Sequence, residues 1–199
     1  MTGSGGHPSI GRLGTDRNYF ESMYESDDDP WGFETSWYEQ RKYQLTVAML
    51  PDARYRRALE PGCANGALTE LLASRCDELV AFDFVDDVVE RARRRLADVG
   101  GVDVRRAEYP TFWPPGTGDL VVWSEVAYYL NVRGAQIAAD GLRRWLEPGG
   151  ALVCVHYTGT TNYPRSGREV GRWLDGVDWL ERTSTHVDQR FEAGVWKRR

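Results

Sequence analysis

Disulfide frameworks, metal sites and membrane spans all need residues that this sequence has in short supply. It holds three cysteines, Cys63, Cys76 and Cys154, an odd number, and two of them lie beside or within apolar runs. Such thiols are typical of a buried packing role, which indicates a reducing cytoplasm and no metal site. No window approaches the roughly 18 uninterrupted apolar residues that a membrane span needs, so we expect a cytoplasmic protein without a membrane partner.

Basic charge is also scarce. Lysine and arginine number 25 against 30 acidic residues, and the formal net charge is −5. The basic run "RARRR" at 91–95 alternates with apolar positions, which predicts a solvated helix face, so we expect no nucleic-acid partner. The segment 1–17 lacks the basic stretch and apolar core of a secretory signal. We interpret it as a flexible tail.

Short aliphatic runs alternate with longer amphipathic segments along the chain, a pattern that predicts a parallel sheet flanked by helices. At 199 residues the chain has the length of one such domain. The last two strands are expected to form a hairpin that turns near Asp188 and Gln189. The fold class is therefore α/β and Rossmann-like, with a seven-stranded, mostly parallel sheet and an antiparallel C-terminal strand. The expected strands are 55–60, 79–84, 102–109, 119–125 and 151–157 besides the hairpin, and the expected helices are 36–50, 66–75, 85–101, 132–146 and one within 163–176.

Two local signals refine this prediction. Ser36, with Glu39 three residues later, is the pattern of a capping box at the start of a helix. The segment 110–118, "PTFWPPGTG", contains three prolines and two glycines and predicts a loop where many such folds have another helix.

The stretch "LEPGCANG" at 59–66 joins the first predicted strand to a helix. No glycine–lysine–serine or threonine ending follows Gly66, which excludes a phosphate-binding P-loop. Ala64 and Ala67 stand where a dinucleotide fingerprint needs glycine. S-adenosylmethionine remains, because its uncharged middle can lie against bare backbone at Gly62 and Gly66. Glu60 would then lie near the cationic amino group of this cofactor.

Two further acids follow neighbouring strands. Asp83 ends the second predicted strand, 17 residues after Gly66, where a carboxylate accepts hydrogen bonds from both ribose hydroxyls. The alternative is a helix-capping aspartate. Glu108 follows the third predicted strand, near the expected adenine edge.

These residues, together with "SEVAYYL" at 124–130, are similar to the class I S-adenosylmethionine-dependent methyltransferases over residues 55–157. More narrowly, "DDPWGFETSWYEQRKY" at 28–43 and "SEVAYYL" resemble the nodulation protein S family. The named members of that family N-methylate an amino sugar during lipo-chitooligosaccharide synthesis. With both motifs the resemblance covers most of residues 27–175. Ala64 departs from the middle glycine that many class I members have, and 158–167 matches no acceptor motif, which leaves the acceptor open.

The resemblance implies a division into a lid and helix over 18–54 and a cofactor-binding methyltransferase domain over 55–199. Trp31, Arg41 and Lys42 would belong to the lid, where a cation binds the methionine carboxylate; Trp31 is alternatively a core aromatic. Further expected contacts to S-adenosylmethionine, or to its product S-adenosylhomocysteine, come from Cys63, Ala64, Phe84, Tyr109, Ser124 and Glu125.

Methyl transfer from a sulfonium is an in-line displacement that needs no metal, but a hydroxyl or protonated amine acceptor needs a base. His156 ends a predicted strand at the ligand-binding edge of the sheet and is the first candidate; the alternative is a structural histidine. Glu125 is the second candidate, or else binds the amino end of the cofactor with Ser124. Tyr128 and Tyr129 either form an aromatic wall around the acceptor, together with His156, or belong to the core.

The expected function is S-adenosylmethionine-dependent methyl transfer to nitrogen or oxygen of a small molecule, such as a sugar or secondary metabolite, by a monomer or homodimer. Two alternatives stay open. One is an RNA or protein methyltransferase, which the acidic balance disfavours. The other is a non-catalytic module that binds S-adenosylmethionine as a signal.

Overall fold

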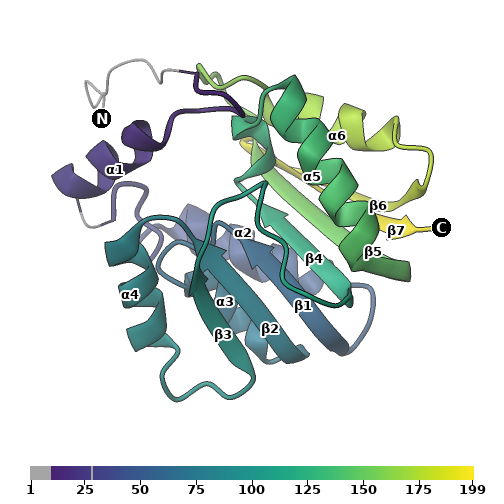
Figure 1. The fold of residues 1–199 in the computed structure, drawn as a ribbon, viewed down its shortest axis with the longest axis horizontal. Helices are drawn as coiled ribbons and strands as arrows, with labels where there is room; N and C mark the ends of the chain where they lie inside the picture. The colour runs from purple at the N-terminus through teal and green to yellow at the C-terminus, as the bar shows by residue number, and fades with distance from the viewer. Residues whose placement is uncertain (1–9, 28) are drawn as a thin grey trace.

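One sheet of seven strands runs through the computed structural model, which describes residues 10–27 and 29–199 (Figure 1). Only β7 runs antiparallel to its neighbours, so the predicted mostly parallel sheet with an antiparallel C-terminal strand is confirmed. In spatial order the strands are β3 (Val102–Arg106), β2 (Cys76–Asp83), β1 (Tyr55–Pro61), β4 (Gly118–Ser124), β5 (Leu146–Tyr157), β7 (Phe191–Arg198) and β6 (Leu180–Val187).

Helices cover both faces of this sheet, because the central strands are apolar on both sides. In β4, Leu120 and Val122 pack toward one face, whereas Val121 and Trp123 pack toward the other. The first face carries α2, α3 and α4, and the second carries α5 and α6. The helical segments are α1 (Arg17–Ser26), α2 (Trp37–Ala48), α3 (Ala67–Ala73), α4 (Asp86–Arg95), η1 (Ala127–Tyr129), α5 (Val132–Trp145) and α6 (Gly167–Asp175). None of the described helices has the length and apolar character to cross a bilayer.

The structure bears out the predicted loop and hairpin, shifts several element boundaries and adds one helix. β2 begins at Cys76 rather than at Leu79, and α4 ends at Arg95 rather than at Gly101. Residues 110–117 contain no helix, and β6 and β7 are joined by a turn at 188–190. β3 ends at Arg106 rather than at Tyr109, and β5 begins at Leu146 rather than at Ala151 because a register shift lets it pair with Gly118 of β4. The added helix is α1, which the sequence did not predict and which begins where the Asp16 carboxylate accepts the Asn18 amide.

The predicted capping box of α2 is wrong. Ser36 is the N-cap residue, but its side chain makes no capping hydrogen bond. The carboxylate of Glu39 is instead turned into the protein, where it binds Lys42 one helical turn later. The pattern was misleading because an acid three residues after a serine can also lie on the buried face of the helix.

Residues 10–17, which we expected to be part of a flexible tail, are bound to the rest of the protein. Ile10 pairs with Thr15, and Gly14 pairs with Leu130 in a second bridge. The Thr15 amide donates to the Tyr129 carbonyl at 2.8 Å, and the Asn131 amide donates to the Leu13 carbonyl at 3.0 Å. These bonds hold the segment against the loop that follows β4; residues 1–9, the rest of the expected tail, lie outside the described part of the chain.

Candidate active site

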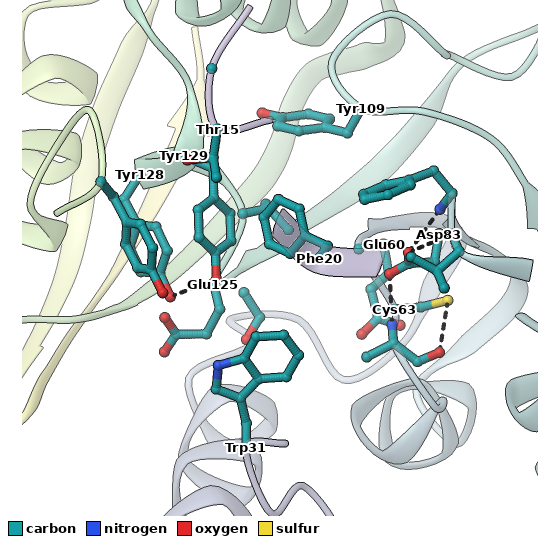
Figure 2. A pocket seen from close by; sticks show the side chains of 18 of the residues that line it. Thr15, Phe20, Trp31, Glu60, Cys63, Asp83, Tyr109, Glu125, Tyr128 and Tyr129 are labelled. Atoms are coloured by element: carbon teal, nitrogen blue, oxygen red, sulfur yellow. Dashed lines mark hydrogen bonds between the residues drawn. The ribbon is translucent and has the colours of Figure 1, made fainter. Parts of the chain in front are cut away.

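A cavity of about 860 Å³ opens at the carboxyl ends of β1, β2 and β4. Ligands bind at this edge of open α/β sheets because loops diverge there from a rigid frame. The N-terminal part of the chain covers the cavity, since residues 11–17, α1 and α2 contribute to its lining. Figure 2 shows Phe20 of α1 and Trp31 in the same cavity as Glu60, Asp83 and Tyr129.

The glycine loop after β1 forms one wall. Gly62 has φ +68°, and a Cβ there would lie 2.4 Å from Cγ1 of Val126, so only glycine fits. Ala64 also has positive φ, +47°. Gly66, at φ +81°, does not line the cavity: it begins α3 and packs against Ala92. The expected ligand contact at Gly66 stays a prediction, and the role that the structure shows is to turn the chain into α3.

Asp83 ties this loop to the end of β2. Its Oδ2 accepts the Ala64 amide at 3.2 Å, and its Oδ1 accepts the amides of Phe84 at 2.7 Å and Val85 at 3.2 Å. Burial raises the pKa of the carboxyl, and the three amides partly offset this. The alternative of a helix cap is wrong, because Val85 is the N-cap residue of α4 and no side chain caps that helix. The Asp83 carboxylate lines the cavity, and its role toward the ribose stays a prediction.

Glu60 lies in the floor of the same half of the cavity and is 2% exposed. Its Oε2 makes no hydrogen bond to any residue that the structure describes. Burial raises the pKa of this carboxyl to about 8. Thr69 lowers the pKa of Glu60 by a side-chain hydrogen bond but does not offset burial. A buried carboxyl oxygen without a hydrogen-bond partner can accept a donor from a ligand.

The remaining contacts expected on this side also line the cavity. Trp31 stacks on Phe33 with ring centroids 5.5 Å apart and meets Tyr24 edge-on at 5.3 Å. The others in the lining are Cys63, Ala64, Phe84, Glu108, Tyr109 and Ser124. Backbone without side chains, a buried acid and a second acid at the next strand suit a ligand with an uncharged chain, an ammonium group and vicinal hydroxyls.

A buried ion cluster joins α2 to the end of β4. Nζ of Lys42 lies 2.7 Å from Oε1 of Glu125 and 2.8 Å from Oε2 of Glu39. Burial alone would raise the pKa of Glu125, but the Lys42 ammonium outweighs it and the pKa is lowered. Burial disfavours the charged Lys42, yet the two carboxylates raise its pKa. Glu125 thus stays ionised, and Lys42 is committed to protein carboxylates.

The backbone at Glu125 is held in a rare conformation, with φ +57° for a non-glycine residue. The Tyr157 amide donates to both carboxylate oxygens at 3.1 Å, and the Glu125 amide donates to the Val155 carbonyl at 2.9 Å. These bonds turn the side chain into the cavity rather than along the strand.

Tyrosines form the wall beside Glu125. Tyr128 stacks on Tyr163 at 5.0 Å, and Tyr129 meets Tyr163 edge-on at 4.6 Å. The hydroxyl of Tyr163 lies 3.3 Å from that of Tyr19 in α1. Burial raises the pKa of Tyr128 and of Tyr129, so both stay neutral. Figure 2 shows Tyr128 and Tyr129 side by side above Glu125.

His156 does not reach the cavity, and its expected role as base is wrong. It is 2% exposed, and its Nε2 accepts the Ala127 amide at 3.0 Å. The neutral ring must then carry its proton on Nδ1, which faces Sγ of Cys154 at 3.3 Å. Burial lowers the pKa of His156 to about 4. The position of His156 at the end of a strand predicted that it lies at the ligand-binding edge of the sheet. It did not predict to which side of the sheet the ring turns.

Arg41 is the other expected contact that lies elsewhere. Its Nη1 binds Asp188 at 2.5 Å, and it does not line the cavity. Successive helical residues point about 100° apart, so Lys42 can face the cavity while Arg41 faces the β6–β7 turn. Only one of the two cations could meet a ligand, and that cation is already paired.

Sequence reasoning missed several lining residues. Tyr43 lies next to Lys42 and four residues after Glu39, a helical spacing that marks the inward face of α2. Arg17 of α1 donates to the Phe84 carbonyl at 3.2 Å and stacks over the Phe84 ring. Other lining residues that no local pattern identified include Phe20, Tyr24, Tyr157, Tyr163 and Arg190. Among the described residues, no group of three or more metal-ligating side chains comes together.

Comparisons with known proteins agree with this geometry. Residues 18–155 match the family model of nodulation protein S. The chain is 38% identical over 128 residues to nodulation protein S of Bradyrhizobium diazoefficiens, covering 63% of this chain and 61% of that protein. It spans only 54% to 61% of the length of the curated relatives that it matches first.

Solved structures share the fold. A proposed methyltransferase from Pseudomonas syringae is 40% identical, with a TM-score of 0.73 over 82% of this chain and 100% of that one. The N-methyltransferase of the nodulation protein S type from Bradyrhizobium japonicum, in complex with S-adenosyl-L-homocysteine, has a TM-score of 0.80 at 23% identity. It covers 90% of this chain and 97% of that one.

Proposed function

The chain belongs to the nodulation protein S family, and we propose that it transfers a methyl group from S-adenosylmethionine to an amine nitrogen of a small molecule. The observation that carries the proposal is the meeting of two chemically different halves in one cavity. One half has the bare glycine loop with Glu60 and Asp83, and the other has the ionised Glu125 among tyrosines.

The first half fits the donor. We infer that Glu60 meets the ammonium group, that Gly62 lets the aminoacyl chain lie against the backbone, and that Asp83 accepts the ribose hydroxyls, because all three line this half of the cavity. Phe84 and Glu108 line the same half, and we assign them to the adenine. When bound, the cofactor supplies a methyl group made electrophilic by the sulfonium.

The second half fits an amine acceptor. Glu125 holds a negative charge at the cavity wall, and the faces of Tyr128 and Tyr129 are attractive to a cation. Glu125 can pair with a protonated amine and hold it in the cavity, and it can accept a hydrogen bond from the neutral amine after a proton has left to the solvent, which orients the nitrogen lone pair for attack. A hydroxyl acceptor carries no positive charge and gains less from this wall, which is why nitrogen is favoured over oxygen.

The N-terminal residues complete the enclosure, and we propose that residues 18–54 act as a lid over the methyltransferase domain of 55–199. Phe20 meets both Phe84 at 5.6 Å and Tyr129 at 4.7 Å, so α1 spans the donor half and the acceptor half. Closure over the reactants excludes water from the transfer.

The proposal includes a small-molecule partner and a monomer or homodimer in the cytoplasm. Support for a reducing compartment comes from Cys63, Cys76 and Cys154, which are buried free thiols. The acidic net charge of −5 disfavours a nucleic-acid acceptor.

The test is calorimetry with S-adenosylhomocysteine, followed by mass spectrometry of products from S-adenosylmethionine and a panel of amines and alcohols. We expect micromolar binding of the nucleoside and methylated amines. Binding of reduced nicotinamide or ATP without binding of S-adenosylhomocysteine would overturn the proposal. Cofactor binding with no product from any acceptor would instead support the non-catalytic module.

A further inference from the structure

Arg190, in the turn between β6 and β7, lines the cavity but makes no ion pair with any residue that the structure describes. The acids that flank it in sequence are bound by other arginines. Asp188 pairs with Arg41 at 2.5 Å. Glu192 pairs with Arg182 at 3.6 Å. The charge of Arg190 is therefore left for solvent or for a ligand.

Aromatic packing fixes the position of this guanidinium. Its Cζ lies 4.0 Å from the centroid of the Tyr38 ring, and the Tyr38 hydroxyl donates to the Arg190 carbonyl at 3.4 Å. The same ring carries Lys42, whose Nζ lies 5.1 Å from its centroid. A guanidinium over a ring face makes contact through its plane, so its N–H groups, which point outward in that plane, stay available to an acceptor. Arg190 thus offers donors that are positioned before any ligand arrives.

Two consecutive amides after β5 tie Arg190 to Glu125. The Tyr157 amide donates to the Glu125 carboxylate at 3.1 Å, and the Thr158 amide donates to the Arg190 carbonyl at 2.8 Å. Glu125 is largely buried, whereas Arg190 is exposed. The acceptor half of the cavity therefore holds a negative charge inside and a positive charge at its opening.

We propose that Arg190 binds an anionic group of the methyl acceptor, so that the acceptor is a zwitterion whose ammonium pairs with Glu125. The inference rests on the proposed function and adds the second charged group of the acceptor. A carboxylate or a phosphate suits the site, because each matches the fork of a guanidinium. Contact at both ends would orient the nitrogen toward the donor. We assign the anion to the acceptor because the contacts of Arg190 come from α2 and the chain after β5, not from the glycine loop.

The test compares kcat/KM for matched primary amines of increasing chain length, each ending in a carboxylate, a phosphate or a neutral hydroxyl. At the length that spans the two charges, we expect the anionic amines to exceed the neutral one by about tenfold or more. Salt screens charges at an exposed site, so this advantage should shrink as the ionic strength is raised.

The variant Arg190→Gln should lose the advantage, so that anionic and neutral amines of one length give similar kcat/KM, and it should bind S-adenosylhomocysteine as the wild type does. Arg190→Glu should shift the preference toward diamines, because the opening then attracts a cation. Arg93→Gln is the matched control for net charge, since Arg93 pairs with Glu90 on α4 and does not line the cavity. It should keep the wild-type preference.

Equal kcat/KM for charged and neutral amines at every length in the wild type would overturn the inference and leave the proposed function intact, and this comparison needs no variant to fold. A loss of S-adenosylhomocysteine affinity in Arg190→Gln of about tenfold or more would show that the guanidinium holds the carboxylate of the cofactor, which overturns the inference as well. Absence of methyl transfer to every amine would overturn both the inference and the proposed function.

Discussion

Lys42 and Glu125 form a 2.7 Å ion pair across 83 residues of sequence, and this pair fixes the charge of the acceptor half of the cavity. The lysine comes from the helix that precedes the sheet, and the glutamate from the turn after its central strand. Because Lys42 is 2% exposed, solvent screens the pair little. The proposed acceptor site thus depends on a contact between the N-terminal helix and the methyltransferase domain.

Replacing Lys42 tests this dependence. Lys42→Met leaves Glu39 and Glu125 buried without their cation, so we expect a loss of about 3 kcal/mol or more in unfolding free energy at neutral pH. The pKa of Glu125 should rise, which moves the acid limb of the kcat/KM profile to higher pH. Urea denaturation and a pH–rate profile measure the two effects. Arg41→Met is the matched control, because Arg41 pairs with Asp188 at a partly exposed site, and it should cost less than about 1 kcal/mol. Similar losses in both variants would contradict the role of Lys42.

Asp83→Asn tests the ribose contact. The amide keeps the size of the side chain but removes the charged acceptor, which is worth roughly 1.5 to 3 kcal/mol and corresponds to about a 10- to 150-fold weaker affinity for S-adenosylhomocysteine. Calorimetry measures the change. Asp86→Asn, whose carboxylate pairs with Arg106 at an exposed position, should bind as the wild type does. An unchanged affinity in Asp83→Asn would show that Asp83 serves the loop alone.

The buried His156 predicts a pH dependence of stability. Its pKa is lowered to about 4 in the folded protein, against about 6.5 when unfolded, so the unfolded chain binds more protons between these values. Stability should therefore fall as pH drops from about 6.5 to about 4, by about 3 kcal/mol in total from this group. In His156→Gln this pH-dependent contribution to the unfolding free energy should be absent, and denaturation at several pH values measures it. A kcat/KM profile that loses a pKa near 6.5 in the variant would instead restore His156 as a base.

Substitutions at Gly62 and Gly149 distinguish two free-energy costs of adding a Cβ, which are backbone strain and a steric clash. Both have positive φ, +68° and +79°, but a Cβ on Gly149 would meet nothing within 4 Å. Gly149→Ala should cost about 1 to 2 kcal/mol from backbone strain. Gly62→Ala adds the clash with Val126, so it should destabilise the protein further and sharply weaken S-adenosylhomocysteine binding. Thermal unfolding and calorimetry on both variants measure this, and equal behaviour would argue against close packing at the loop.

Much of the arrangement of strands and loops can be predicted from local patterns in the sequence. The run "DLVVWS" is apolar at every position from Leu120 to Trp123, which predicts a strand buried on both faces, and that is where β4 lies. The glycine loop and Asp83 could be located because strand ends converge at one edge of a parallel sheet. The helix α1 was not predicted: none of its residues is buried, and its aromatic residues Phe20 and Tyr24 line the cavity instead of packing in the core.

The sequence by itself determined the order of strands and helices, the seven-stranded sheet and the donor loop, because each depends on neighbours in the chain. Only the tertiary structure decided which charges meet in the cavity. It turned Lys42 inward and Arg41 outward, buried His156 against Ala127 and left Oε2 of Glu60 without a hydrogen-bond partner among the described residues. The pKa of a buried group depends on burial and on facing charges, and for these residues the deciding neighbours lie far away in sequence.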